Sequence, residues 1–358
     1  MSVVSINRST RIDFTALDNT WTINPDISVF VQADVAVAST IANSRFTNNG
    51  VVFAAVNFNN GNGALSFSGN NAVIQNATAA SITGFDGGLT VGGIGASIDN
   101  DGSITGAREF GVLFGSGSRD VNLDNSGKIY GGSFGVWVIN SSDGGTTNNS
   151  GEIRSGSVGI GATLNTGVTT VINNAKDGVI QGVAKAIEVN FGRFVLDNKG
   201  TINGLVQGAL ASGADDVTNS GTINGLTRLG NGDDTFAFAG GKQGTVFGEA
   251  DSDTFVFEGK IAPKKKGVAT IGDFTPADDT IGLSKGLFKK IGKSGTLKDK
   301  FFGLGKKASD TSEHILYDDN SGLLRYDKDG KGGAKAKVFG LLDGGPDGVT
   351  ADDFTIVA

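Results

Sequence analysis

The 358-residue chain carries 30 basic and 37 acidic side chains, a net charge of −7, and the acidic excess lies in its first 257 residues. Nucleic-acid binding depends on Lys and Arg neutralising phosphates, so an acidic chain of this kind argues against a nucleic-acid partner. The chain has no cysteine, which excludes disulfides and thiol chemistry. It also has neither an apolar run of membrane-spanning length nor a signal-peptide pattern at residues 1–16, and we expect no transmembrane segment.

Residues 1–45 lack the repeat that dominates the rest of the chain. Within them, residues 21–23 and 29–31 alternate between apolar and polar side chains as strands do. The open end of a solenoid exposes backbone donors and apolar side chains, so this segment is expected to form the first strands and an N-terminal cap. The alternative is a strand that is exchanged between molecules during assembly.

One phrase recurs through residues 46–228, and its clearest copy reads Ile98-Asp99-Asn100-Asp101-Gly102-Ser103-Ile104. The asparagines of its clear and weak copies stand at positions 48, 76, 100, 125, 149, 174, 198 and 219, so successive gaps are 28, 24, 25, 24, 25, 24 and 21. A period near 24 over so long a stretch indicates a solenoid. The alternative, a glycine-rich disordered chain, would not keep this register.

The side-chain pattern of the phrase predicts the form of one coil. Ile98, Asn100 and Ile104 share one parity, which in a strand points to one face. We therefore expect the isoleucines to face inward and the asparagine to stack at a bend on the same residue of the neighbouring coils. Two further short apolar runs follow in each coil, as at residues 111–114 and 121–123. Three strands per coil of about 24 residues predict an all-β, right-handed parallel β-helix over residues 46–228.

The period shortens to 19 near residue 213. Asp215, Asp234 and Asp253 fall in one column at this spacing, and each is followed two residues later by an apolar side chain. Stacked carboxylates repel one another unless a cation lies between the coils, and Ca²⁺ binds carboxylate and turn-carbonyl oxygens. The sequence therefore predicts calcium binding, although these aspartates could instead only cap turns.

Residues 229–236, which read Leu229-Gly230-Asn231-Gly232-Asp233-Asp234-Thr235-Phe236, resemble the hemolysin-type, or RTX, calcium-binding repeat, whose pattern is G-G-x-G-x-D followed by an apolar residue. Residues 248–255 keep the first glycine and the aspartate but place Glu249 and Asp251 where that family has glycine. The resemblance implies an RTX β-roll over residues 229–260, with a transition from about residue 213, and Ca²⁺ as the bound ion. The metal-binding residues that column and resemblance together indicate are Asp215, Gly230, Asn231, Gly232, Asp234, Gly248, Asp251 and Asp253.

Residues 261–358 are expected to form a β-rich C-terminal domain. It opens with the charged run Pro263-Lys264-Lys265-Lys266, interpreted as a linker or exposed loop, with a basic patch for anionic glycans or membrane surface as the alternative. Residues 269–283 resemble the segment that follows RTX repeats in serralysin-type secreted proteins, and residues 349–358 are similar to that family's type I export signal. The resemblance implies export by the type I secretion machinery of a Gram-negative bacterium to the cell surface or medium.

A further acidic turn lies in this C-terminal domain. Asp327 and Asp329 stand in a D-x-D-G turn and, with Asp318 and Asp319, could hold another Ca²⁺. A plain β-hairpin turn explains the same residues.

Catalysis finds little support in the sequence. Polysaccharide lyases and epimerases need a base, a charge neutraliser and an acid on one strand face. The only histidine, His314, lies outside the coils, and no H-E-x-x-H motif occurs. Charged coil residues such as Arg154, Lys185 and Glu188 are expected to share no column.

The leading hypothesis is a secreted, calcium-binding β-helical structural protein that is not an enzyme. Its coils resemble the Asn-x-Gly-rich passengers of bacterial adhesins and hemagglutinin-like proteins. It would act by self-assembly into a surface layer or filament, or by adhesion, at the cell surface or in the extracellular matrix. Its expected partners are further copies of itself, joined through coil faces or helix ends, and surface polysaccharide or lipopolysaccharide. The alternative is an extracellular lyase or epimerase acting on an acidic glycan.

Overall fold

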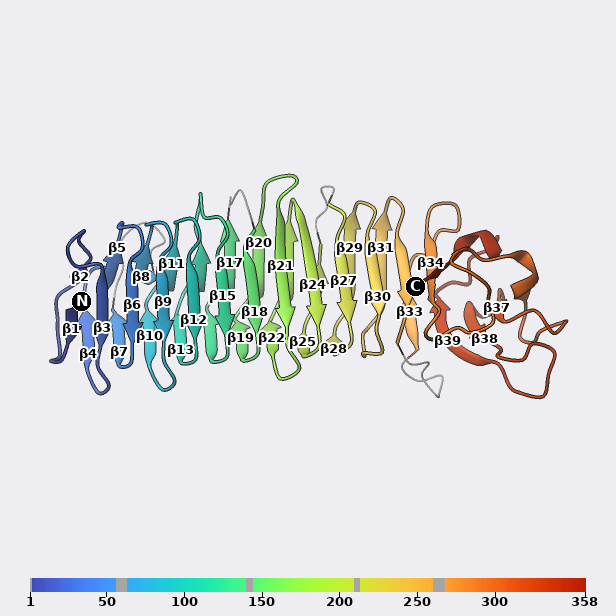
Figure 1. The fold of residues 1–358 in the computed structure, drawn as a ribbon, viewed down its shortest axis with the longest axis horizontal. Coiled ribbons are helices and arrows are strands. Elements are labelled where there is room, and N and C mark those ends of the chain that lie inside the picture. Colours follow the sequence, from blue (N-terminus) through green and yellow to red (C-terminus); the bar gives the residue numbers. More distant parts are fainter. Residues whose placement is uncertain (1, 56–62, 140–143, 209–212, 260–267) are drawn as a thin grey trace. The chain divides into compact units, whose positions relative to one another are not determined.

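The computed structural model describes residues 2–55, 63–139, 144–208, 213–259 and 268–358. The chain is an all-β solenoid of about ten turns with about 24 residues per coil, and its parallel strands stack into three faces (Figure 1). The predicted parallel β-helix with three strands per coil is therefore confirmed. The only helices in the described ranges are two 3-10 turns, η1 (Asp299–Phe301) and η2 (Ala351–Asp353). The expected loop or linker at residues 263–266 lies outside the described residues.

The fold comprises two compact units. The first unit is Met1–Val195 with Gly200–Leu205, and the second is Leu196–Lys199 with Val206–Ala358. Strand β24 (Arg193–Asn198) spans the point where the chain passes from one to the other.

From β3 (Thr20–Ile23) onward, each coil of the first unit contributes one strand to each of three faces, whereas the first coil reaches face 2 only through the Arg8–Val29 bridge. Face 1 consists of β1 (Ser2–Val4), β3 (Thr20–Ile23), β6 (Arg45–Asn48), β9 (Val73–Asn76), β12 (Ser97–Asn100), β15 (Asn122–Asn125), β18 (Thr146–Asn149) and β21 (Thr169–Asn174). Face 2 consists of β4 (Ser28–Val31), β7 (Val51–Ala54), β10 (Ser81–Gly84), β13 (Ser103–Gly106), β16 (Lys128–Gly131), β19 (Glu152–Ser155), β22 (Val179–Gly182) and β25 (Thr201–Asn203). Face 3 consists of β2 (Ile12–Asp13), β5 (Val37–Ser39), β8 (Gly63–Phe67), β11 (Gly87–Val91), β14 (Phe110–Phe114), β17 (Phe134–Ile139), β20 (Val158–Thr163) and β23 (Lys185–Asn190).

The repeated phrase forms two of these strands with a bend between them. Ile98 pairs in register with Leu123 on face 1, and Ile104 pairs with Ile129 on face 2. All four side chains are buried, so the predicted inward parity is confirmed. Stacking identical positions on successive coils makes one continuous apolar core along the unit.

The asparagines form the predicted ladder inside the core. Each side-chain Nδ2 donates to the Oδ1 of the asparagine one coil later, and the donor–acceptor distances are 2.9 Å for Asn48–Asn76, 2.7 Å for Asn76–Asn100, 2.7 Å for Asn100–Asn125, 2.8 Å for Asn125–Asn149 and 2.9 Å for Asn149–Asn174. The same nitrogens also donate to strand carbonyls, as Asn76 does to Ser103 at 3.1 Å. Buried amides are tolerated here because the ladder satisfies them.

In the coils with a two-residue corner, the glycine two residues after the asparagine is required by close backbone contact. A Cβ on Gly127 would lie 2.0 Å from the carbonyl oxygen of Gly102, and one on Gly151 would lie 2.1 Å from that of Gly127. The coils can therefore stack at the face 1–face 2 corner only without a side chain at this position.

We predict that Gly127→Ala lowers the free energy of unfolding by at least about 2 kcal/mol, because backbone atoms must move apart to admit the methyl group. Urea denaturation followed by circular dichroism measures the change. Gly117→Ala is the matched control for adding a methyl group at a glycine, because nothing lies within 4 Å of a Cβ there, although its positive φ of 86° carries a strain of its own. A Gly127→Ala protein as stable as the wild type would contradict the stacking argument.

The N-terminal 45 residues continue the same coil, although the phrase is not visible in them. Ile23 pairs in register with Asn48, so an apolar side chain occupies the place of the asparagine. The strands expected at residues 21–23 and 29–31 are confirmed as parts of β3 and β4.

The second unit begins with the same three faces and then becomes a two-sheet coil. Face 1 continues as β27 (Asp216–Asn219), β30 (Thr235–Phe238), β32 (Thr254–Phe257), β34 (Thr280–Ser284), β40 (Phe354–Val357) and β35 (Gly295–Thr296). Face 3 continues as β26 (Val206–Gln207), β29 (Thr227–Asn231), β31 (Val246–Ala250), β33 (Ala269–Ile271), β39 (Lys337–Leu342), β38 (Leu323–Tyr326), β37 (Ile315–Asp318) and β36 (Phe302–Leu304). Face 2 ends at β28 (Thr222–Asn224) in the described part of the chain. Loss of this strand explains the shorter 19-residue coil.

The asparagine ladder ends where the coil shortens. Asn198 donates to Asn219 at 2.7 Å, and Asn219 donates to the carbonyl of Lys242 and the side chain of Gln243, each at 3.0 Å. In the next coil Phe238 pairs with Asn219, and its ring stacks on that of Phe257 at 4.8 Å. Aromatic packing thus replaces amide pairing in the core of the shorter coils.

The C-terminal residues close the second unit. Strand β40 pairs in parallel with β34, and β39 pairs in parallel with β33, whereas β37, β38 and β39 are antiparallel. Over the described residues, no helix is long and apolar enough to cross a membrane.

Candidate metal site

The three aspartates predicted to form a column are buried and stacked in the second unit. Asp215, Asp234 and Asp253 expose 1%, 1% and 2% of their surface. The backbone N–H of Asp215 donates to Oδ1 of Asp234 at 2.6 Å, and that of Asp234 donates to Oδ1 of Asp253 at 3.0 Å. The carboxylates of Asp234 and Asp253 therefore each cap the backbone of the preceding coil, as the turn-capping interpretation expects.

Sequence reasoning missed a fourth member of the column. This member is Asp279. The N–H of Asp253 donates to Oδ1 of Asp279 at 3.0 Å, and the N–H of Thr275 donates to Oδ2 of Asp279 at 2.8 Å. Asp279 lies 26 residues after Asp253 rather than 19, so it falls outside the period. The in-register pairing of Phe255 with Ile281, each two residues further on, places it in the column.

Burial leaves the column with an electrostatic cost. Oδ2 of Asp234 is buried without a hydrogen-bond partner. Burial chiefly, assisted by the charges of neighbouring carboxylates, raises the pKa of Asp234 and of Asp253 to about 8 each. Burial also raises the pKa of Asp279. A bound cation would remove this cost, because it would neutralise the carboxylates that burial disfavours.

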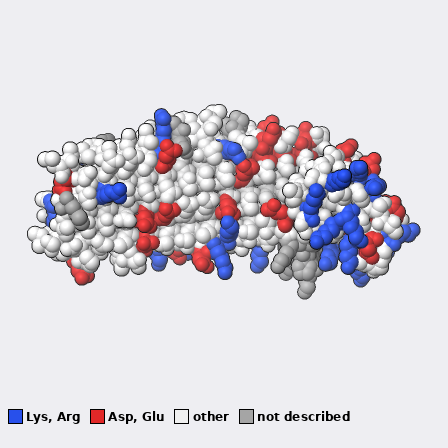
Figure 2. All heavy atoms as spheres, viewed as in Figure 1, with Lys and Arg blue, Asp and Glu red and all other residues white. Residues whose placement is uncertain are grey.

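A second, more exposed row of carboxylates runs beside the first. Oδ2 of Asp251 accepts from the N–H of Gly232 at 3.0 Å. The side chain of Asp273 accepts from the N–H groups of Gly248 and Glu249 at 3.0 and 2.9 Å. Figure 2 shows Asp and Glu gathered over the turns that follow β29 and β31, whereas Lys and Arg gather over the part of the unit beyond β34.

The turns at residues 230–232 and 249–251 differ in sequence, but both have residues with positive φ angles at the first and third positions. Gly230 and Gly232 have φ values of 111° and 125°, and Glu249 and Asp251, one coil later, have values of 76° and 78°. Asn231 pairs with Ala250 between them. The departure from the glycine pattern therefore leaves a left-handed turn in place, at the cost of strain in two residues that carry a Cβ.

We predict that the free energy of unfolding of Glu249→Gly is about 1 kcal/mol higher than that of Glu249→Ala. Glycine adopts a positive φ without strain, whereas alanine does not. Comparing these two variants removes the contribution of the Arg228–Glu249 ion pair at 2.6 Å, which both variants lose. Thermal denaturation of the two proteins side by side measures the difference. Equal stability would show that the turn relaxes around the side chain.

The donor set of the column fits calcium better than a softer metal. The side chains supply hard oxygens, and Ca²⁺ completes its shell with turn carbonyls and water. Among the described residues, no three His, Cys, Asp or Glu side chains converge on a point, so side chains alone would not form the shell. Gly248 has a role in this arrangement, because a Cβ there would lie 2.0 Å from Oδ2 of Asp253. A side chain at position 248 would displace the carboxylate.

The acidic turn at Asp327 and Asp329 lies at the opposite end of the β37–β38 pair from Asp318. Strands β37 and β38 are antiparallel, and Asp318 pairs with Leu323 at one end whereas Tyr326 pairs with Ile315 at the other. Asp318 contacts Arg325 at 3.7 Å and Lys306 at 3.9 Å, while Nδ1 of His314 lies 2.7 Å from the carbonyl oxygen of Asp327. The expectation that Asp318 joins Asp327 and Asp329 in one site is therefore wrong. The D-x-D-G sequence follows β38 and begins its connection to the antiparallel strand β39, so it lies in a hairpin connection, as the alternative interpretation expects.

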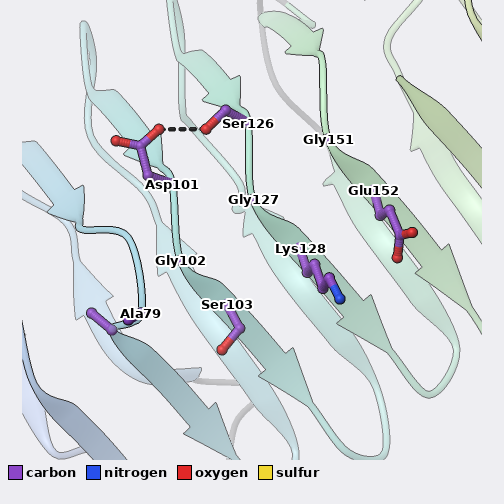
Figure 3. Close-up of a pocket in the computed structure, with 10 residues that line it drawn as sticks. Ala79, Asp101, Gly102, Ser103, Ser126, Gly127, Lys128, Gly151 and Glu152 are labelled. Carbon is purple, nitrogen blue, oxygen red and sulfur yellow. Dashed lines mark hydrogen bonds between the residues drawn. The ribbon is translucent and has the colours of Figure 1, made fainter. Parts of the chain in front are cut away.

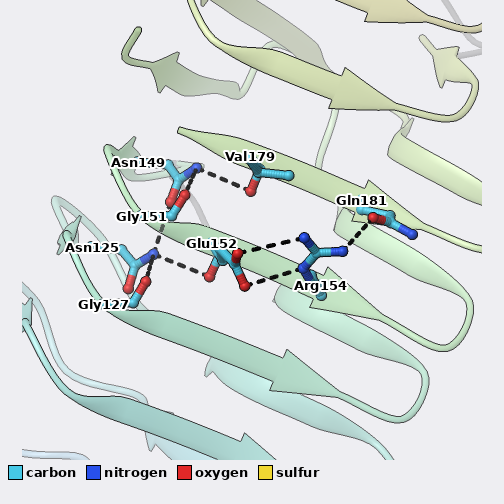
Figure 4. A network of polar contacts seen from close by, with 8 residues as sticks. All are labelled: Asn125, Gly127, Asn149, Gly151, Glu152, Arg154, Val179 and Gln181. Carbon is cyan, nitrogen blue, oxygen red and sulfur yellow. Dashed lines mark hydrogen bonds and ion pairs between the residues drawn. The ribbon is translucent and has the colours of Figure 1, made fainter. Parts of the chain in front are cut away.

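Charged coil residues named from the sequence share no column, as expected. Arg154 lies on face 2 and bridges Glu152, at 3.2 Å, and Gln181, at 2.5 Å (Figure 4). Lys185 and Glu188 lie on face 3 and form an ion pair with each other. Tyr130 and Arg154 are 24 residues apart, one period of the repeat, and they are paired in register on adjacent strands.

Comparison with family models, with curated proteins and with solved structures finds no match to this chain.

Proposed function

We propose that this chain is a secreted, calcium-binding β-solenoid that serves as a structural protein of the cell surface or extracellular matrix. It acts by self-assembly into a layer or filament, or by adhesion. The observation that carries the proposal is the buried column of Asp215, Asp234, Asp253 and Asp279, in which Asp234 keeps a carboxylate oxygen with no partner.

Calcium binding would offset the cost of burying the carboxylates of this column. Four buried carboxylates in consecutive coils cost free energy unless they are protonated or neutralised by a cation. Calcium is scarce inside cells and abundant outside them, so the coils would fold fully only after export. This agrees with the likeness to RTX repeats and to a type I export signal noted in the sequence.

The structural role rests on repetition. Faces 1, 2 and 3 of the first unit each present one strand per coil in register, so any weak contact made by one coil can be repeated by the next. Further copies of the chain are the first expected partner, and surface polysaccharide is the second.

Electron microscopy of the purified full chain tests the assembly role. We expect ordered sheets or filaments in millimolar CaCl₂ and dispersed particles in EGTA. The double variant Asp234→Asn, Asp253→Asn should stay dispersed in calcium, whereas Asp278→Asn, an exposed carboxylate in the same turn as Asp279, should assemble normally. Dispersed wild-type monomers in calcium would reject self-assembly.

The second candidate is a polysaccharide lyase or epimerase, favoured by one observation. Tyr130, exposed at 43%, stands next to Arg154 on face 2, and such a pair could supply a proton donor and a charge neutraliser. Release of unsaturated uronates from polygalacturonate or alginate, followed by absorbance, would establish it. Loss of that activity in Tyr130→Phe would assign it to this face.

A further inference from the structure

We propose that a recess on the first unit, at the corner between faces 1 and 2, binds a short oligosaccharide of about three sugar units that is neutral or carries amino groups. This inference rests on the proposed adhesive function and names the ligand class and the site that would serve it.

The recess is an open, shallow hollow with a floor of backbone. Its volume is about 400 Å³, and its floor is formed by Gly102, Gly127 and Gly151 (Figure 3). No side chain can grow from this floor, because a Cβ on any of the three would clash with the neighbouring coil. The hollow is therefore a necessary product of how the coils stack.

A longer turn bounds the recess at one end, and a second long turn lies one coil beyond its other end. Four residues, 77–80, separate Asn76 from β10, and four residues, 175–178, separate Asn174 from β22, whereas the three coils between have only two residues at this corner. In Figure 1 the turns after β9 and β21 extend further than those after β12, β15 and β18. Ala79 and Ala80, in the first of these turns, line the recess.

The length of the recess suits a short glycan. Three coils at about 4.8 Å each give a floor of about 14 Å. The coil spacing is comparable to the advance of one sugar residue in an extended chain. Successive sugars could therefore meet successive coils with the same local geometry.

The groups that line the recess favour a polyhydroxylated ligand over a peptide. Backbone N–H groups at the corner are already used, as when Asp101 and Gly102 both donate to the carbonyl of Asn76. A peptide strand would find no unpaired backbone donors there. The side chains that line the recess are Ser103, Ser126, Lys128 and Glu152, and the hydroxyl of Ser126 already donates to Asp101 (Figure 3). Together these side chains can donate to and accept from hydroxyl groups of a ligand. Arg154 holds Glu152 in place from the adjacent side, as Figure 4 shows.

The charge around the recess disfavours an acidic glycan. Asp101 and Glu152 line it against a single lysine, Lys128. Burial, and then the charges of Asp101 and Asp124, raise the pKa of Asp99, so several carboxylates act together beside this corner. A uronate chain would be repelled, whereas an amino sugar would be attracted.

Nuclear magnetic resonance titration of the full chain in calcium tests the proposal with three trimers: chitotriose, the glucosamine trimer and trigalacturonate. We expect the amide signals of Gly102, Gly127 and Gly151 to shift with the first two, and at least tenfold weaker binding of trigalacturonate. Ser126→Trp should fill the recess and weaken binding at least tenfold, and Glu152→Gln should weaken it severalfold. Ser220→Trp is the matched control, because Ser220 occupies the same exposed Asn-Ser-Gly corner of the second unit.

Three results would overturn the proposal: no shift with any trimer at millimolar concentration, equal binding to wild type and Ser126→Trp, or tightest binding of trigalacturonate. The outcome is separable from that of the proposed function. Asp234→Asn with Asp253→Asn should abolish calcium-dependent assembly and leave the shifts at the recess unchanged.

Discussion

Asn125→Ala is expected to lower the free energy of unfolding by about 2–5 kcal/mol. The substitution removes the acceptor of Asn100, at 2.7 Å, and the donor to Asn149, at 2.8 Å, in the middle of a buried ladder. Two amides then lose a partner away from water, and a small cavity is left beside them. Urea denaturation of the purified variant measures the change.

Asn148→Ala is the matched control for the ladder. Asn148 is next in sequence to Asn149 but faces outward, where it donates to Asp124 at 2.7 Å. Its loss should cost less than about 1 kcal/mol, because water can replace the lost contact. Similar losses for Asn125→Ala and Asn148→Ala would contradict the claim that the buried ladder stabilises the coil.

The stability of the calcium-free protein is expected to fall as the pH rises from about 4 to about 8. Burial raises the pKa of Asp234 and Asp253 to about 8, well above the value of an exposed aspartate. The native state therefore binds more protons than the unfolded state between these limits, and stability is greatest below the unfolded pKa and is lost as the pH passes through the folded one. Urea denaturation in EGTA at pH 5, 6.5 and 8 measures the trend.

Calcium should reverse this dependence. The ion competes with protons for the same oxygens, so its stabilising effect should grow with pH and be largest at pH 8. The variant Asp234→Asn with Asp253→Asn should show a smaller decline in EGTA, because Asp279 remains, and should lose most of the gain in calcium. A calcium-free protein whose stability rises steadily over this range would contradict the account of the column.

The regular part of the fold could be predicted from the sequence because each coil repeats the same physical constraint. The parity of Ile98, Asn100 and Ile104 is sufficient to place the core, the bend and the ladder. The first coils were harder to recognise because Ile23 replaces the asparagine, and a core position can be filled by an apolar side chain as well as by a paired amide.

The candidate site was only partly predictable, for a different reason. Asp215, Asp234 and Asp253 follow one another at intervals of 19 residues, so the 19-residue period is enough to align them. Asp279 joins the column only through the pairing of β32 with β34, which a 26-residue separation hides. The error at Asp318 has a similar cause, since sequence proximity to Asp327 does not reveal that an antiparallel pair puts the two at opposite ends.

The recess was also invisible in the sequence. Its floor of glycines and the longer turn at residues 77–80 that bounds it belong to different coils, which are brought together only when the coils stack.

The most direct test of the account is a crystal structure of the full chain grown in CaCl₂, with anomalous scattering used to locate calcium. The account predicts anomalous peaks beside the carboxylates of Asp234 and Asp253, between successive 19-residue coils. A fully folded second unit with no peak along that column, or with calcium only at Asp327 and Asp329, would contradict it.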